Sequence, residues 1–230
     1  MKDNGEKAGH SPIRDFLKRA WHFLWHDESL LSYVVLLFLS ILLVVYIIYP
    51  LLGLFMNTSL PVVAIVSGSM EHGVSADGNI CGNTPQRDYS GRMNLDDWWN
   101  YCGNYYEEEF LISKDDFLGF PYSGGMYIGD VVFLRGVDGE DIEVGDVLIF
   151  EPGNRNWYEA HGPVIHRVVE INEEGGEYYF TTKGDANEGV EIGDFERDIP
   201  EDRVFGVATT RIPYIGYPRV LLNELIMVFR

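Results

Sequence analysis

The feature that most constrains this chain is an apolar stretch near its N-terminus. Residues 30–49 read LLSYVVLLFLSILLVVYIIY and carry no charge. At about 1.5 Å per residue, such a helix spans roughly the 30 Å hydrocarbon core of a bilayer. A soluble buried helix would normally keep a polar face, and a cleaved signal peptide would have a shorter apolar region and a small-x-small site after it. The pattern therefore predicts a retained transmembrane anchor over residues 30–56, with Pro50 bending or ending its helix.

Basic residues predict the orientation of this anchor. No Lys or Arg occurs between the anchor and Arg87, whereas five precede the anchor: Lys2, Lys7, Arg14, Lys18 and Arg19. The positive-inside rule therefore predicts that residues 1–29 are cytoplasmic and that the chain from residue 57 onward is extracytoplasmic. Apolar residues between Ile13 and Trp25 recur at helical spacing, which predicts either a short helix in the membrane interface or a plain extension of the anchor helix.

Composition narrows the function classes. The net charge is −19, from 36 acidic and 17 basic residues, and this argues against nucleic-acid binding, which needs a basic face. A surface rich in acids and poor in lysine suits a protein that stays hydrated in high salt. The two cysteines, Cys81 and Cys102, are too few for a four-ligand zinc site, and they are either a disulfide outside the cell or two free thiols.

The rest of the chain predicts a mainly β protein. Residues 73–125 have weak periodicity and are interpreted as a long insertion built from local turns. After them come short runs rich in Val, Ile, Tyr and Phe, separated by turn residues, which predict an antiparallel β domain over residues 57–217. The apolar residues 218–230 cover only half a membrane span and predict a final strand or a helix lying at the interface.

A possible site of chemistry lies where the apolar region ends, in the sequence Ser-Gly-Ser-Met at residues 67–70. A serine hydroxyl is a weak nucleophile that needs a base and donors for the oxyanion that forms. Gly68 allows a tight turn that exposes Ser69, and Ser67 could add a hydroxyl donor. The alternative is that both serines simply decorate a turn.

His166 is the main candidate for the base. It lies in VIHRVVEI, where strand alternation places it on one face with Val164 and Val168, so that its imidazole is partly desolvated and favours its neutral form. A core histidine satisfied by a hydrogen bond would have the same pattern, and Lys183 is a competing base. The other histidines lie before the anchor or in turn-like contexts: His10, His22, His26, His72 and His161. Residues 182–194 could supply a carboxylate to the second nitrogen of His166, or form a solvated acidic surface.

The order of these motifs resembles that of type I signal peptidases of the archaeal and endoplasmic-reticulum kind. An anchor and Ser-Gly-Ser-Met are followed by GDVVFL and GDVLIF, then VIHRVVEI, TKGDAN and VFGVATTRIPYIG. The match covers the anchor, residues 60–72 and residues 126–217. In this branch a histidine replaces the lysine of the bacterial enzymes.

The resemblance implies a role for each residue of the motifs. Ser69 would be the nucleophile, His166 the general base and Ser67 an oxyanion donor, with no metal or cofactor. Asp185 matches the aspartate of Gly-Asp-x-Asn, and Glu191 stands where the family has a second aspartate.

The chain departs from the family pattern in several places. Glu191 replaces an aspartate, so the third member of the triad is open among Asp185, Glu191 and Asp194, the last if the loop shifts register. His72 stands where the family usually has proline. The insertion of residues 73–125 separates the serine from the first GD strand by more than in shorter family members.

The expected function is a membrane-bound serine endopeptidase that cleaves signal peptides from exported preproteins. A signal peptide would run extended beside the strand that ends at Val66, and Val63, Ile65 and Val66 would contact its small side chains. The expected partners are signal peptides, the lipid bilayer of the cell membrane and the protein-export channel, and the acidic composition suggests a halophilic archaeal source. Two alternatives are a related membrane protease with a narrow substrate set and a noncatalytic anchored β domain.

Overall fold

The computed structural model describes residues 12–75, 78–85, 91–190 and 195–228. Internal contacts divide the chain into two units, Met1–Leu52 and Gly53–Arg230, which are described separately.

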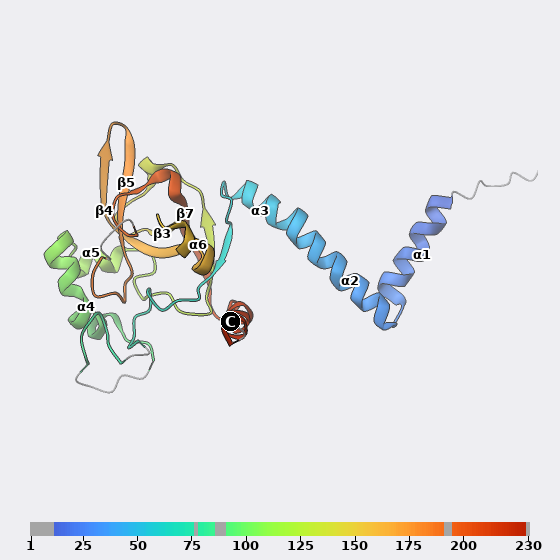
Figure 1. Cartoon of the computed structure of the whole chain (residues 1–230), viewed down its shortest axis with the longest axis horizontal. Helices are drawn as coiled ribbons and strands as arrows, with labels where there is room; N and C mark the ends of the chain where they lie inside the picture. The colour runs from blue at the N-terminus through green and yellow to red at the C-terminus, as the bar shows by residue number, and fades with distance from the viewer. Residues whose placement is uncertain (1–11, 76–77, 86–90, 191–194, 229–230) are drawn as a thin grey trace, which may run out of the picture. The chain divides into compact units, whose positions relative to one another are not determined.

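The first unit is helical. Helix α1 (Pro12–His26) is followed by α2 (Leu30–Leu43), a π-helical turn at Val44–Ile48, and α3 (Tyr49–Phe55), which begins in this unit. Ser29 caps the start of α2 by accepting a hydrogen bond from the main-chain N–H of Ser32. Because the chain is not helical between α1 and α2, α1 is a separate helix rather than an extension of the anchor helix (Figure 1).

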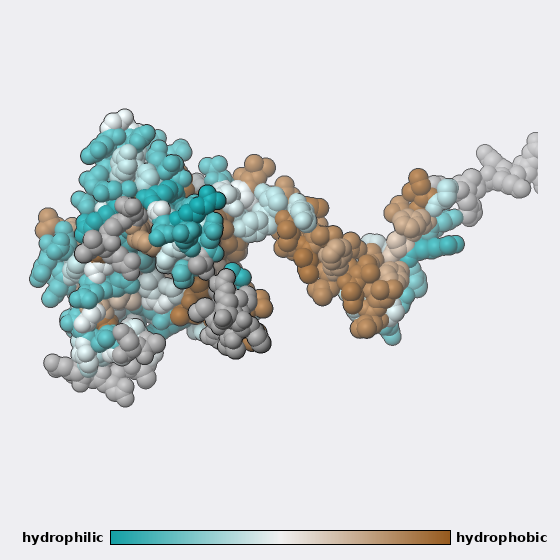
Figure 2. All heavy atoms as spheres, in the orientation of Figure 1, coloured by the Kyte–Doolittle hydropathy of each residue, from teal (hydrophilic) through white to brown (hydrophobic). Residues whose placement is uncertain are grey.

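The helix from Leu30 to Phe55 is long and apolar enough to cross a membrane, and no other helix among the described residues is. Figure 2 shows hydrophobic side chains along its length. Of the two predicted alternatives, Pro50 does not end this helix, which continues to Phe55. A proline lacks the N–H that would bond to the carbonyl four residues earlier, and the wider π turn at Val44–Ile48 lies directly before this point.

The second unit is built on one seven-stranded antiparallel sheet, which confirms the predicted β domain (Figure 1). The strand order is β1-β2-β7-β3-β4-β5-β6. The strands are β1 (Val62–Ala64), β2 (Val131–Arg135), β3 (Val147–Phe150), β4 (Val164–Glu174), β5 (Glu177–Lys183), β6 (Ile199–Pro200) and β7 (Val204–Ile212).

Apolar side chains of the sheet form two buried clusters. One contains Ile142, Leu148, Phe150, Val164, Val168, Phe180, Ile199 and Val207. The other contains Ile65, Met70, Met126, Val132, Leu134, Val147 and Ile149. The second cluster contains Ile65 and Met70, which lie before and after the turn of Ser69. The serine therefore lies on a turn whose two ends are fixed in the core.

The insertion, residues 73–125, contains two helices, so the prediction of turns alone was wrong. They are α4 (Leu95–Phe110) and α5 (Lys114–Gly119), and Asn94 and Ser113 cap their N-termini. The insertion has a core of its own, in which Trp98, Trp99, Cys102 and Tyr106 of α4 pack around Phe117 of α5.

A disulfide between Cys81 and Cys102 closes this insertion. Between the two possibilities left by the sequence, the structure therefore has the disulfide. The insertion core also contains Val169 of β4 and Val190, so it is packed against the sheet and against the chain that follows β5.

Two further helices follow in the chain. Helix α6 (Arg155–His161) lies between β3 and β4, and short 3-10 turns occur at Gly139–Asp141 and Glu201–Arg203. The C-terminal segment forms helix α7 (Tyr217–Val228), so of the two predicted alternatives it is a helix and not a strand.

Candidate active site

Ser69 and Ser67 lie on the turn that follows β1 and contact each other. The Oγ atoms of the two serines are 3.1 Å apart, and the main-chain N–H of Ser69 donates to Ser67 Oγ at 3.2 Å. Ser67 is exposed and Ser69 is half-buried. The turn is closed by the N–H of Glu71, which donates to the carbonyl of Gly68 at 3.0 Å. A half-buried hydroxyl on a fixed turn is accessible to a reactant without being mobile.

His166 is buried in β4 and contacts a carboxylate. Its Nδ1 atom forms an ion-pair contact with Oε1 of Glu196, and 9% and 1% of the two side chains are exposed. The contact does not have hydrogen-bond geometry, but a carboxylate beside Nδ1 favours the tautomer in which Nδ1 carries the proton and Nε2 keeps a lone pair. The contact thus prepares the opposite nitrogen of the ring to accept a proton.

The loop of residues 184–187 connects the serine to the histidine. The N–H of Ala186 donates to the main-chain carbonyl of Ser69 at 2.8 Å. On the other side, a methyl group at Gly184 would lie only 2.8 Å from His166 Nε2. One short loop therefore contacts both residues, and the position of Gly184 leaves space that the imidazole occupies.

Asp185 makes its hydrogen bonds away from His166. Arg167 donates to both of its oxygens, from Nε to Oδ1 at 2.9 Å and from a terminal nitrogen to Oδ2 at 2.8 Å. Tyr106 donates to Oδ1 at 2.9 Å, and His72 Nε2 lies 3.0 Å from Oδ2. These four contacts match the four lone-pair positions of a carboxylate. Asp185 therefore belongs to a buried network with Arg167, Tyr106 and His72, and it is not the partner of His166.

Charge in this network is balanced by Arg167. Burial alone would raise the pKa of Asp185, but the adjacent Arg167 and the hydrogen bond from His72 outweigh it and hold that pKa well below its usual range. Burial also acts to lower the pKa of Arg167, and the charge of Asp185 more than offsets this. The two groups therefore stay ionised together inside the protein.

Lys183, the competing candidate base, points into the loop rather than to the serine. Its Nζ donates to the carbonyls of Gly184, Asp185 and Asn187 at 3.0, 3.3 and 2.8 Å. Burial lowers the pKa of Lys183 to about 8, although the nearby Asp185 acts to raise it. These three bonds give Lys183 a role in holding the loop.

Strand β1 lies at the edge of the sheet, next to β2 alone. The N–H and carbonyl of Ile65 bond to the chain before β2, to the carbonyl of Asp130 at 2.8 Å and the N–H of Gly129 at 2.9 Å. Main-chain groups alternate along a strand, so those of Ala64 and Val66 face the open edge.

The three residues expected to contact substrate differ in burial. Ile65 is buried in the sheet core and Val63 packs against the same cluster, whereas Val66 is 39% exposed. Of these three side chains, Val66 is thus the one most accessible to a ligand at the edge strand.

The carboxylate next to His166 was missed by sequence reasoning. Glu191 and Asp194, the other expected partners of the histidine, lie outside the described residues. Glu196 is held in place because its carbonyl accepts the N–H of Thr182 at 2.8 Å and its Oε1 accepts the N–H of Gly184 at 3.3 Å. The signal available in the sequence was an acid between the Gly-Asp-x-Asn motif and β6, but several acids share that region.

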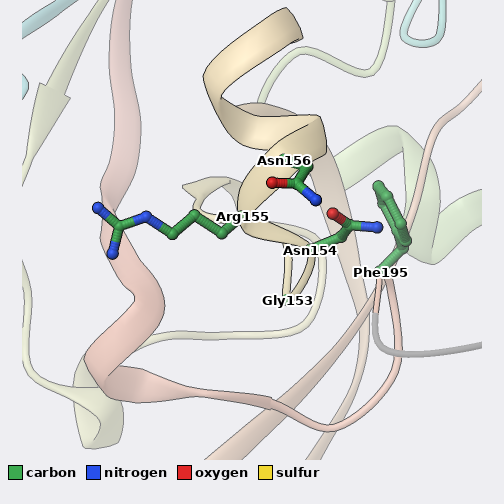
Figure 3. A pocket seen from close by; sticks show the side chains of 5 residues that line it. All are labelled: Gly153, Asn154, Arg155, Asn156 and Phe195. Carbon is green, nitrogen blue, oxygen red and sulfur yellow. The ribbon is translucent and has the colours of Figure 1, made fainter.

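A hollow of about 420 Å³ lies at the start of α6 (Figure 3). It is lined by Gly153, Asn154, Arg155, Asn156 and Phe195. The ring of Phe195 packs edge-on against Trp157, with centroids 5.2 Å apart. The contact links α6 to the residue before Glu196 and so supports the chain that carries the carboxylate.

A serine on an anchored turn, a buried histidine and a carboxylate on its Nδ1 atom are the parts of a serine hydrolase site. The fold and this set of residues define a candidate serine peptidase of the signal-peptidase type.

Comparison with known proteins agrees with this class. The chain is 29% identical over 100 residues to "Signal peptidase complex catalytic subunit SEC11C" of Homo sapiens, covering 42% of this chain and 50% of the relative. It is 32% identical over 101 residues to the SEC11 subunit of Colletotrichum graminicola (42% and 55% covered) and 28% identical over 110 residues to that of Dictyostelium discoideum (44% and 58%). Its homologues are thus catalytic subunits of signal peptidase complexes, and the chain spans about half the length of these relatives. No protein-family model matches the chain.

Proposed function

We propose that this protein is a membrane-bound serine endopeptidase that cleaves signal peptides from exported preproteins. The observation that carries the proposal is the position of His166 between the Glu196 carboxylate and the loop of residues 184–187. Glu196 contacts its Nδ1 atom, and the loop that contacts its Nε2 side also bonds to the main chain of Ser69.

In the proposed reaction, Ser69 Oγ attacks the carbonyl carbon of the scissile peptide bond while His166 Nε2 takes the hydroxyl proton. Glu196 holds the ring and stabilises the imidazolium that forms. His166 then gives the proton to the leaving amine, the C–N bond breaks, and an acyl ester on Ser69 is left. Water attacks this ester while His166 accepts a proton from it. His166 then returns a proton to Ser69 Oγ as the ester C–O bond breaks, which releases the acid product and the free serine.

We propose Ser67 as an oxyanion donor, and its hydroxyl bonds to Ser69 Oγ in the resting site. Ser69 N–H and Ser67 Oγ are also paired with each other. When a substrate carbonyl enters, the Ser67 hydroxyl rotates to donate to its oxygen beside the Ser69 N–H, where charge develops in the tetrahedral intermediate. The resting hydrogen bonds thus keep the two donors together before substrate arrives.

The edge of β1 is the proposed binding position for the substrate. An extended signal-peptide segment would pair with the main-chain groups of Ala64 and Val66, which face the open edge. This pairing would carry the peptide directly to Ser69, three residues beyond Val66. Val63, Ile65 and Val66 are proposed to limit the size of the side chains accepted before the cut.

The membrane helix supports a location at the cell membrane. We propose a single span at Leu30–Phe55 with the N-terminus in the cytoplasm and the active site outside, because basic residues precede the span. Partners would be signal peptides, the bilayer and the export channel. The acid-rich composition is the basis for proposing a halophilic archaeal source.

A panel of preproteins tests this function against its alternatives. The purified full chain, in membranes or detergent, is incubated with several unrelated preproteins, and the cut sites are mapped by mass spectrometry. We expect cleavage of most of them after small side chains. Cleavage of a single substrate would support the narrow-specificity protease, and cleavage of none would support the noncatalytic β domain.

A further inference from the structure

The insertion, residues 73–125, makes direct contact with the loop of residues 184–187. The hydroxyl of Tyr106, on α4, donates to Asp185 Oδ1 at 2.9 Å, with both side chains completely buried. Burial, and then the negative charge of Asp185, raise the pKa of Tyr106 well above its ordinary value, so the hydroxyl keeps its proton and acts as a donor. A helix far away in the sequence therefore holds the side chain at the centre of this loop.

The disulfide brings a second part of the insertion to the same loop. Cys81 Sγ lies 3.4 Å from the main-chain oxygen of Asp185. Because this sulfur is bonded to Cys102, it carries no proton and the approach is a packing contact rather than a hydrogen bond. Cys102 and Tyr106 lie four residues apart on one face of α4, so the disulfide joins the Cys81 contact to the Tyr106 contact.

His72 extends the network to the start of the insertion. Its ring stacks on Trp98 of α4, with centroids 3.8 Å apart and planes 3° apart, and its Nε2 atom contacts Asp185. Its Nδ1 atom is buried without a hydrogen-bond partner among the described residues, so the contact of Nε2 with Asp185 is the hydrogen bond that holds this ring. This residue follows Ser69 closely in sequence, so the network also fixes the chain that leaves the serine.

We propose that the insertion is a positioning clamp: Tyr106 and the Cys81–Cys102 disulfide, together with His72 directly before the insertion, hold the loop of residues 184–187 in contact with Ser69 and His166. The clamp rests on the proposed peptidase function for its effect on turnover. Its structural part rests only on the contacts of Asp185. Asp185, Tyr106 and His72 are then positioning residues, which act through the loop and do not touch substrate.

Two hydrogen bonds among the described residues join the loop to the serine turn: one from Ala186 to Ser69, and one from the N–H of Asp185 to Met70 Sδ at 3.5 Å. The bond from Ala186 to the Ser69 carbonyl is a single main-chain hydrogen bond, and it lies next to Asp185. If Asp185 loses one of its donors, its carboxylate can shift, and the adjacent bond to Ser69 shifts with it. Small displacements of reacting groups cost much more in turnover than in substrate binding.

Tyr106→Phe tests the clamp because it removes one hydroxyl and keeps the ring. Tyr105→Phe is the matched control, since its hydroxyl is on the same helix but accepts the N–H of Val190 instead of contacting Asp185. For Tyr106→Phe we expect kcat to fall by about ten- to a hundredfold with KM changed by less than about twofold. We also expect faster hydrogen–deuterium exchange in a peptide covering residues 184–187. Tyr105→Phe should match the native chain in all three measurements.

A second variant, Cys81→Ser with Cys102→Ser, removes the disulfide and should also accelerate exchange in residues 184–187 and lower kcat. Native exchange of this loop in both Tyr106→Phe and the double serine variant would overturn the proposal. Faster exchange with unchanged kcat would overturn it as well, as would equal effects of Tyr105→Phe and Tyr106→Phe. If the native chain cleaves no preprotein but exchange responds as expected, the clamp stands and the proposed peptidase function fails.

Discussion

Glu196 contacts Nδ1 of His166 with Oε1, and both side chains are almost entirely buried. The same carboxylate oxygen also accepts the N–H of Gly184. One acid therefore orients the proposed base and holds the start of the loop beside it. A carboxylate with both contacts is a stronger candidate for the third member of the triad than Asp185, whose oxygens bond to Arg167, Tyr106 and His72.

Glu196→Gln should therefore reduce kcat by about 10³- to 10⁴-fold, because an amide favours the wrong tautomer of His166 and cannot stabilise the imidazolium. Steady-state cleavage of a preprotein measures this, and Glu188→Gln, an exposed acid nearby, should be unaffected. Glu191→Gln and Asp194→Asn are the competing variants. If either of them abolished turnover while Glu196→Gln retained it, the assignment of Glu196 would be wrong.

Gly184→Ala should strongly reduce the proposed peptidase activity while leaving the chain folded. The added methyl group would lie 2.8 Å from both His166 Nε2 and Asn187 Nδ2, so the ring or the loop must move. We expect kcat to fall by at least about a hundredfold, as for other small displacements of catalytic groups. At Gly124 an added methyl group meets nothing within 4 Å, so Gly124→Ala is the control. Native kcat in Gly184→Ala would show that this loop does not confine His166.

Asp185→Asn should lower stability strongly, because it leaves the buried charge of Arg167 without its partner. Loss of one member of a buried ion pair costs about 3–5 kcal/mol of unfolding free energy. Denaturant unfolding of the full chain in detergent measures this, and the exposed Asp138→Asn serves as the control. A loss of less than about 1 kcal/mol, the range of exposed pairs, would contradict the role given to this network.

The ion pair of Asp185 and Arg167 also predicts how the unfolding free energy changes at low pH. The folded-state pKa of Asp185 is lowered, so the unfolded chain takes up a proton first as pH falls. The contribution of Asp185 is fully present above its unfolded pKa of about 3.9 and is lost progressively below it. The difference in unfolding free energy between the native chain and Asp185→Asn should therefore shrink as pH falls below this value. A difference that stayed constant into strong acid would contradict the ion pair.

Lys183 predicts a second rise of stability with pH, at high pH. Burial lowers its pKa from 10.5 to about 8 in the folded chain, so between these values the unfolded chain binds more protons. Unfolding free energy should then rise with pH across this window, by about 3 kcal/mol in total at 1.36 kcal/mol per pKa unit. The rise is measured as the difference in unfolding free energy between the native chain and Lys183→Met at each pH. This difference cancels the titration of the tyrosines that both proteins contain. An equal pH dependence in the two proteins would contradict the lowered pKa.

Much of the architecture could be predicted because it depends on local patterns. A long uncharged stretch predicts a membrane helix, and the short β-branched runs correctly predict an antiparallel sheet. The helix α4 was missed because Gly103 and a row of polar residues obscure its periodicity. Its buried face was nevertheless present in the spacing of Trp98, Cys102 and Tyr106, four residues apart, and tertiary packing rather than propensity stabilises it.

The candidate site was harder to predict because its contacts cross large separations in sequence. Ser69 and His166 were identified from motifs and a family resemblance, and these residues stay proposals. Asp185 was expected beside His166, but it is paired with Arg167, the next residue along β4. Side chains alternate across a strand, so the consecutive residues His166 and Arg167 point to opposite faces of β4. The face on which a carboxylate lies decides which of these two residues it contacts. No local pattern could distinguish Glu196 from the other acids after β5.

The most direct test of the proposed peptidase is the cleavage of one preprotein in membranes by the native full chain and by Ser69→Ala. The account predicts that the native chain releases the signal peptide and that Ser69→Ala does not, while the two proteins have the same melting temperature. Ser67→Ala, which removes the neighbouring hydroxyl, should retain activity reduced by about 10²- to 10³-fold, the usual cost of losing one oxyanion donor. Signal-peptide release by Ser69→Ala at the native rate would contradict the account.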